Sequence, residues 1–228
     1  MNVLSYKIGF WSAILLALTF IIWIVCFVEI AMTSPLFYWT NLPDYITFFQ
    51  TNSQTFQNIA KFFMLLFGPI YVVFINSFYD YASDEKKVLV RLSLLFGIAF
   101  AVLSSLHYFV QLTSVRLNIE HGQFAGLEHF VQANPNSIMT SIDMLGWTLF
   151  LGLSSLFIFP IFTGDRLNKI IRYAFIANGF SCILAGIGYV FQIDLITFLF
   201  VNLGVGGAVL TLTIASIKLF KRWEKNSH

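Results

Sequence analysis

The sequence predicts an all-α protein, a single transmembrane domain of six helices with both chain ends on the inner side of a membrane. Of the 228 residues, 58% are hydrophobic and 11% are charged, whereas about 25% of the residues of a soluble domain are charged. The apolar residues also form six long runs, and nearly all Lys and Arg residues lie on one side of them. This composition excludes soluble enzymes, disulfide scaffolds, nucleic-acid-binding proteins and disordered proteins.

Each apolar run is long enough to cross a hydrocarbon core of about 30 Å as a helix. The first run exceeds the apolar region of a signal peptide, about 7–15 residues, and no small-residue cleavage site follows it. We therefore expect it to remain as a membrane helix, and we expect residues 1–228 to form one domain. The six helices are predicted at about 8–32, 57–79, 88–112, 137–162, 170–191 and 194–218.

Two longer segments, 33–56 and 113–136, connect the helices on the outer side. The first contains a series of aromatic residues, which is typical of a segment that lies along the membrane interface. In the second, four apolar residues fit one face of a short amphipathic helix. These four residues are Phe124, Leu127, Phe130 and Val131.

The positions of Lys and Arg predict the orientation, because loops that carry these residues are retained in the cytoplasm. If the N-terminus lies inside, only Lys61 and Arg116 of the 13 cationic residues fall on the outer side. Six crossings then place the C-terminus inside as well. The inner cations are Lys7, Lys86, Lys87, Arg91, Arg166, Lys169, Arg172, Lys218, Lys221, Arg222 and Lys225.

Polar and ionisable residues of several helices fall at one depth near the outer side. Counted at 1.5 Å per residue from the inner ends of the helices, they lie about 24–33 Å above those ends. A charge at the bilayer centre costs about 2.5–3.5 kcal/mol, so such groups normally face protein or water. This layer predicts an outward-facing polar pocket. Its predicted ligand-binding residues are Glu29, Lys61, His107, Gln111, Arg116, Asp143, Trp147, Tyr189 and Asn202.

Two alternatives remain open for this layer. Glu29, Lys61 and Asp143 can instead extend into the headgroup region, with their apolar stems in the membrane. Lys61 can also pair with Glu29 or with Asp143 inside a pocket. His107 is the side chain suited to exchange a proton near neutral pH.

Histidine and acidic residues near the second outer segment suggest a zinc site, but their spacing does not support one. The pairs Glu120-His121 and Glu128-His129 are separated by glycines and do not form the His-Glu-x-x-His pattern of catalytic zinc sites. No serine stands in a Gly-x-Ser-x-Gly setting. We therefore predict no metal, no other cofactor and no catalytic residue, and we favour a protein that is not an enzyme.

Four stretches in the middle of the chain resemble a group of uncharacterised bacterial six-helix integral membrane proteins. They are 107–116 (HYFVQLTSVR), 133–137 (ANPNS), 143–147 (DMLGW) and 152–157 (GLSSLF). The resemblance implies a bacterial plasma (inner) membrane location, a shared architecture and a shared site around Gln111, Arg116 and Asp143. It implies no activity.

The leading hypothesis is a multi-pass membrane protein that binds, senses or transports a small amphipathic or weakly charged ligand in the outer pocket. One alternative is an intramembrane enzyme that modifies or hydrolyses lipid, with His107 and Asp143 as acid and base. Another is a helper subunit of a membrane complex. The expected partners are membrane lipids and the ligand, with a homo-oligomer or a second membrane protein as further options, and without nucleic acid.

Overall fold

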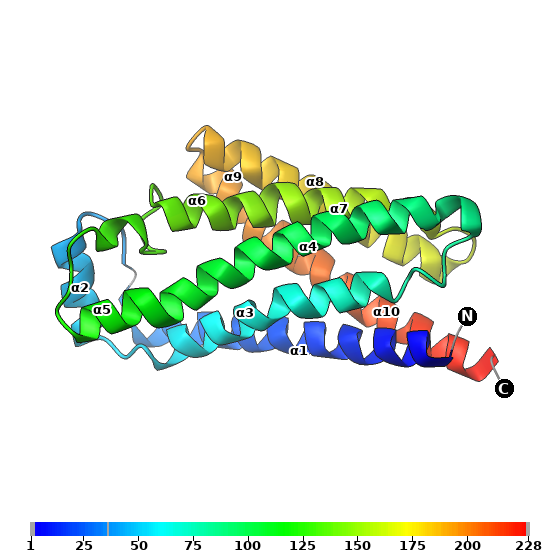
Figure 1. The fold of residues 1–228 in the computed structure, drawn as a ribbon, viewed down its shortest axis with the longest axis horizontal. Helices are drawn as coiled ribbons and strands as arrows, with labels where there is room; N and C mark the ends of the chain where they lie inside the picture. The colour runs from blue at the N-terminus through cyan, green and yellow to red at the C-terminus, as the bar shows by residue number, and fades with distance from the viewer. Residues whose placement is uncertain (1–2, 36, 227–228) are drawn as a thin grey trace.

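The computed structural model of the protein describes residues 3–35 and 37–226, and this part of the chain contains helices and no strand (Figure 1). Six helices are long and apolar enough to cross a membrane, so the predicted all-α six-helix bundle is confirmed. These six spans are Leu4–Thr33, Thr55–Asn76, Asp84–Glu120, Ile138–Ile161, Arg166–Val190 and Asp194–Trp223.

Several spans consist of more than one helical element, because π-helical or 3-10 turns interrupt or flank their α-helices. The α-helices are α1 (Val3–Thr33), α2 (Leu42–Thr51), α3 (Thr55–Asn76), α4 (Lys87–Val110), α5 (Arg116–Glu120), α6 (Ile138–Met144), α7 (Leu151–Ile158), α8 (Arg166–Val190), α9 (Asp194–Phe198) and α10 (Gly206–Asn226).

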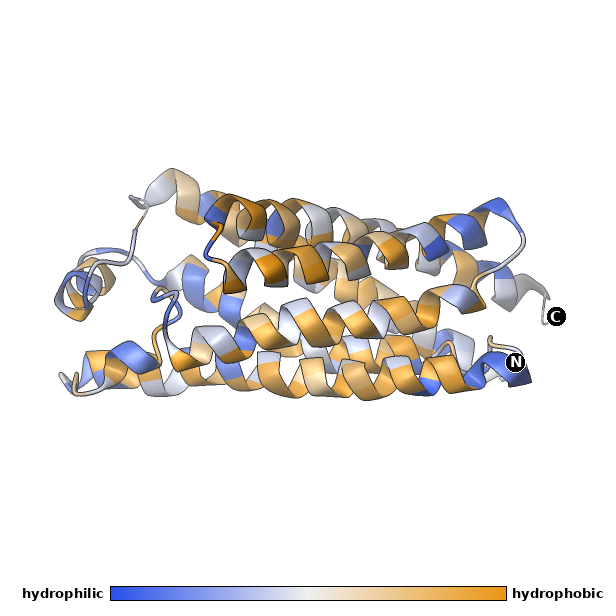
Figure 2. Ribbon diagram, turned by 90° about the horizontal axis from the view of Figure 1, so that it is seen from above, coloured by the Kyte–Doolittle hydropathy of each residue, from blue (hydrophilic) through white to orange (hydrophobic). Residues whose placement is uncertain are grey.

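The six spans close into a ring in which each helix packs against two neighbours. In order around the ring they are α1, α3, α4, α7, α8 and α10, and α10 packs against α1. Both marked termini lie at the same end of the bundle (Figure 1), which we call the inner end. We call the opposite end, which carries α2 and α5, the outer end. Hydrophobic residues cover the middle of the helices and hydrophilic residues gather at both ends, as a membrane-spanning bundle requires (Figure 2).

Polar contacts hold the inner end together. The Asp165 side chain begins α8 by accepting a hydrogen bond from the Asn168 N–H at 3.0 Å, and it also pairs with Arg222 of α10. The N–H bond and the Arg222 guanidinium keep the pKa of the Asp165 carboxyl below its usual range. The Tyr81 hydroxyl donates to Asn168 Oδ1 at 2.7 Å. The ends of α8 and α10 are thereby joined to the turn after α3.

The second outer segment differs from its prediction. The helix expected to end near 112 continues through a π-helical turn, Gln111–Val115, into α5 and ends at Glu120. Beyond it, Gly122 and Gly126 have φ values of 70° and 73°, a conformation that stops a helix. The expected amphipathic helix is therefore replaced by turns and one 3-10 turn, Leu127–His129. Of its four apolar residues, Leu127 and Val131 are buried, Phe124 is half-buried and Phe130 is exposed.

Three π-helical turns occur in the part of the chain that the structure describes, and all lie in its outer half. They are Gln111–Val115, Leu145–Phe150 and Leu199–Val205. Such turns are rare within α-helices and are frequent at functional sites. They identify the outer half as the part of the bundle whose helices are least regular.

Small residues allow the helices to approach one another closely. A Cβ atom placed on Gly68 of α3 would lie 2.8 Å from the Ala101 Cα of α4, and one on Gly179 of α8 would lie 2.5 Å from the Leu156 Cγ of α7. Ser105 of α4 donates to the Leu65 carbonyl at 3.0 Å. These small residues serve contacts within one chain, as helix association in lipid requires.

A column of buried aromatic rings fills the middle and inner parts of the bundle. At the end of the column nearer the outer side, the Trp147 ring centroid lies 5.5 Å from that of Phe67 and 4.9 Å from that of Phe100. At the inner end, Phe78 contacts rings from three other segments at centroid distances of 5.1 to 6.3 Å. The partners of Phe78 there are Phe162, Phe175 and Phe220.

Candidate ligand cavity at the outer end

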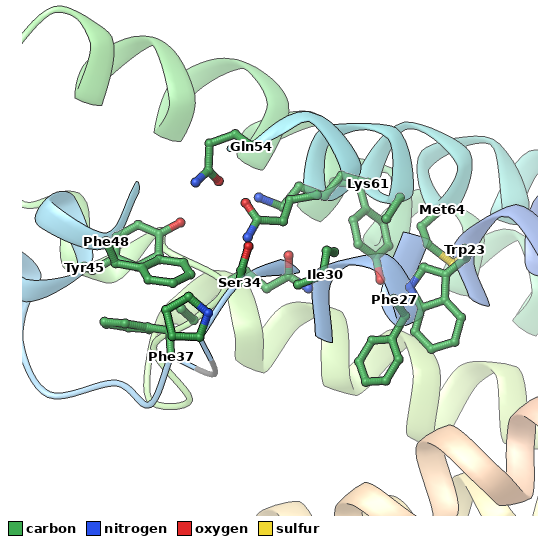
Figure 3. Close-up of a pocket in the computed structure, with 16 residues that line it drawn as sticks. Trp23, Phe27, Ile30, Ser34, Phe37, Tyr45, Phe48, Gln54, Lys61 and Met64 are labelled. Atoms are coloured by element: carbon green, nitrogen blue, oxygen red, sulfur yellow. The ribbon is translucent and has the colours of Figure 1, made fainter. Parts of the chain in front are cut away.

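A cavity of about 420 Å³ lies at the outer end, between α1 and α3 and beside α2 (Figure 3). Tyr108 of α4 and the segment 132–133 complete its wall. Its lining residues are Trp23, Phe27, Ile30, Ser34, Pro35, Phe37, Tyr45, Phe48, Gln54, Gln57, Ala60, Lys61, Met64, Tyr108, Gln132 and Ala133.

Aromatic side chains form two walls of this cavity. On one side, Trp23 and Phe27 of α1 stack with ring centroids 5.6 Å apart. On the other side, the Phe37 ring lies 4.9 Å from Phe48 and 5.6 Å from Tyr45 of α2. Figure 3 shows these two groups of rings on opposite sides of the polar residues. The cavity thus offers apolar surface to a ligand from both sides.

The position of α2 follows from its sequence. The Asn41 side chain accepts a hydrogen bond from the Asp44 N–H at 2.9 Å and begins the helix, and Pro43 stands in its first turn. The Asn52 amide then donates to the Phe48 carbonyl at its end. The short helix is therefore held at both ends, and it presents Tyr45 and Phe48 to the cavity.

Figure 3 shows the side chains of Lys61, Gln54 and Ser34 in the region between the two aromatic walls. Gln54 is partnered, because its amide donates to the Phe49 and Asn52 carbonyls at 3.1 and 3.0 Å. Within residues 3–35 and 37–226, no carboxylate lies within 4.0 Å of the Lys61 ammonium. The cavity therefore contains a cation without a counter-ion among the described groups.

Two further polar groups in the lining bear on this cation. Gln57 lies one turn before Lys61 on α3, and its buried Oε1 has no hydrogen-bond partner among the described atoms. Burial raises the pKa of the Tyr45 hydroxyl to about 12. Because this phenol stays neutral at physiological pH, it does not supply the negative charge that Lys61 lacks.

His107 and Asp143 form a separate buried pair behind the cavity wall. His107 Nε2 lies 3.8 Å from Asp143 Oδ2, and the two side chains are 0% and 11% exposed. The ring Nδ1 lies 3.0 Å from the Met139 carbonyl, so Nδ1 carries a hydrogen and donates it. His107 Nε2 and Asp143 Oδ1 have no hydrogen-bond partner among the described atoms. Trp147 packs beside the Asp143 carboxyl.

Gln111 holds the outer segment against the bundle. Its amide donates to the Phe130 carbonyl at 2.6 Å, and its Oε1 accepts a hydrogen bond from the Gln132 N–H at 3.1 Å. Gln111 is 1% exposed. Because Gln132 and Ala133 line the cavity, this double hydrogen bond positions one part of its wall.

Replacing Gln111 with leucine should loosen that wall. The change removes a hydrogen-bond partner from the Phe130 carbonyl and from the Gln132 N–H, and each lost bond costs about 0.5–1.5 kcal/mol, because both bonds are only partly buried. We expect faster amide hydrogen exchange over residues 127–133 than in the wild type. Gln123→Leu, at an exposed position of the same segment, is the matched control. Unchanged protection in Gln111→Leu would show that other contacts hold the segment.

The predicted site residues lie in several places. His107, Gln111, Asp143 and Trp147 are brought together inside the bundle, and Lys61 projects into the cavity. Tyr189 and Asn202 line a second outer cavity of about 560 Å³, bounded by α6, α9 and the last π-helical turn. The structure thus divides the predicted layer among neighbouring environments.

Two predicted residues lie apart from these groups. Arg116 pairs with Glu120 of α5 at 3.0 Å. Glu29 of α1 is half-buried, and it lines neither outer cavity. Glu29 and Asp143 were predicted as partners of Lys61, and neither of them forms an ion pair with Lys61.

The aromatic walls and two glutamines of the cavity were absent from the predicted set. Gln54, Gln57 and Lys61 are spaced three and four residues apart, which places them on one face at the start of α3. This spacing is a signal that sequence reasoning can use. No such spacing predicts that Trp23 and Tyr45 line the cavity, because their positions depend on how α1 and α2 pack.

Among the described residues, no group of three or more His, Cys, Asp or Glu side chains is arranged to hold a metal ion. Comparison of the chain with protein-family models, curated proteins and solved structures found no match. The proposed function therefore depends on the geometry of the cavity.

Proposed function

We propose that this multi-pass membrane protein binds a small amphipathic ligand in the outer cavity, as a step in sensing or transport. We further propose a bacterial plasma membrane location with the inner end in the cytoplasm, which is supported by the distribution of Lys and Arg. The observation that carries the proposal is the meeting of aromatic walls and a single unpaired cation in one cavity.

The size and chemistry of the cavity support ligand binding. Small-molecule pockets are typically about 300–1,000 Å³, mostly apolar, with a few polar groups that orient the ligand. The outer cavity has about 420 Å³ and matches this description. Rings such as Trp23 and Phe48 suit the apolar part of the ligand, and Lys61 suits its polar end.

The position of His107 and Asp143 favours binding over catalysis. Neither residue lines the outer cavity, and a catalytic acid or base must come within hydrogen-bond reach of its substrate. His107 and Asp143 are thus better suited to hold α4 and α6 together than to act on a bound molecule.

Filling the cavity tests the proposal. We expect ten-carbon amphiphiles, added to the protein in phosphatidylcholine nanodiscs, to raise the melting temperature of the wild type in a saturable way. Binding at one hundred times the Kd stabilises a protein by about 2.7 kcal/mol. Ala60→Phe, at a buried lining position, should abolish this rise.

Matched variants separate a blocked cavity from a disturbed fold. Ala177→Phe makes the same change at an exposed position of α8 outside the cavity and should keep the full response. Ser34→Trp, at a half-buried lining position, should block binding with less strain than Ala60→Phe. An equal response in the wild type and in both folded cavity variants would refute the proposal.

A further inference from the structure

We propose that the ligand is a single-chain amphiphile with an anionic head, a carboxylate or a phosphate, and that Lys61 binds this head. The inference depends on the proposed function and specifies the chemical class of the ligand. It follows from the charge of the cavity lining, which contains one lysine and no acidic residue.

The acidic groups of the neighbouring elements are not available to Lys61. On α1, Glu29 does not line the cavity. On α2, Asp44 accepts hydrogen bonds from Thr40 and Asn41 at 2.6 and 2.9 Å. On α6, Asp143 faces His107. These three carboxylates are thus engaged elsewhere or lie outside the cavity.

A cation in such surroundings favours an anionic ligand. An ammonium among apolar groups loses hydration, and an anionic ligand that pairs with it compensates for this loss. A cationic head would meet repulsion from Lys61, and a neutral head would leave the ammonium unpaired. Figure 3 shows the Lys61 side chain reaching between the aromatic walls, beside Gln54 and Ser34.

The walls also specify where the chain of the ligand lies. The rings of Phe37, Tyr45 and Phe48 lie on one side of the ammonium, and Trp23 and Phe27 lie on the other. A flexible apolar chain attached to an anion at Lys61 therefore contacts aromatic surface immediately next to its head. Gln57, whose Oε1 has no hydrogen-bond partner among the described atoms, adds an acceptor for a hydroxyl or acidic hydrogen on the head.

The test compares ligands that share a ten-carbon chain and differ in the head. Decanoate and decyl phosphate should bind wild-type protein in phosphatidylcholine nanodiscs at least about tenfold more tightly than decanol or decylamine. Lys61→Met should remove this preference, and Lys61→Arg should keep it. Lys218→Met, at an exposed position of α10, is the control and should behave as the wild type.

The outcomes separate the inference from the proposed function. If decanol and decylamine bind as tightly as decanoate, and Ala60→Phe blocks all of them, the cavity binds amphiphiles and the anionic head is refuted. If none of the four probes binds, both proposals fail. Phosphatidylglycerol in the nanodiscs distinguishes the source of the anion. If it competes with decanoate in the wild type and not in Lys61→Met, the anion comes from a lipid headgroup and the single-chain part of the inference is refuted. If it does not compete, the ligand is a free single-chain anion, as proposed.

Discussion

Replacing Asp143 with alanine should lower the free energy of unfolding by about 1–3 kcal/mol, the usual cost of leaving a buried polar group without its partner. The change leaves His107, which is 0% exposed, without the carboxylate that lies 3.8 Å from its Nε2. His107→Ala should have a similar effect, because it removes the imidazole that lies 3.8 Å from the buried Asp143 carboxyl. Reversible unfolding in mixed detergent micelles measures both changes.

A double-mutant cycle shows whether the two residues act as a pair. We expect the double alanine variant to cost less than the sum of the single variants, because it removes both polar groups together. Asp194→Ala, which removes an exposed carboxylate, should change the stability little. Strictly additive effects of the two single changes would mean that the contact at 3.8 Å carries no coupling.

Gly68→Ala should destabilise the bundle by about 1–3 kcal/mol, the usual cost of overpacking. The new Cβ would lie 2.8 Å from the backbone Cα of Ala101, and a backbone atom moves only if α3 and α4 separate. This separation would disturb the helix that carries Lys61. Thermal unfolding in nanodiscs measures the loss.

Gly207→Ala provides the control, because a Cβ at Gly207 meets no atom within 4 Å. Alanine is about 1 kcal/mol more favourable than glycine in a helix, so this variant should be as stable as the wild type or more stable. A Gly68→Ala protein that melts at the wild-type temperature would show that the two helices adjust freely.

The spans were predictable from the sequence because hydropathy and charge are local properties. Six apolar runs and the positions of the cations identify six helices and one end that carries both termini. The continuation of α4 to Glu120 was not predictable in this way, because it depends on a π-helical turn at Gln111–Val115. Gly122 and Gly126, which end the helix after this turn, are visible in the sequence only once its extent is known.

The depth of the site residues in the membrane was predictable from the sequence, but the neighbours that their side chains face were not. Counting residues places Lys61, His107 and Asn202 at similar heights, but helix packing turns them towards different neighbours. Lys61 faces the cavity, His107 faces Asp143, and Asn202 lines the second cavity. The partners of Lys61 in its cavity come from α1 and α2, whose contacts with α3 no local pattern records.

The outer half of the bundle contains the cavity, whereas the aromatic column fills the inner half with packed rings. Lys61 and Phe78 lie on one continuous stretch of chain, which reaches from the cavity to the ring cluster formed with Phe162, Phe175 and Phe220. The open volume thus lies at the outer membrane face, and packed rings from the turn after α3, the α7–α8 turn, α8 and α10 fill the inner one, so the aromatic column separates a molecule bound in the cavity from the inner face.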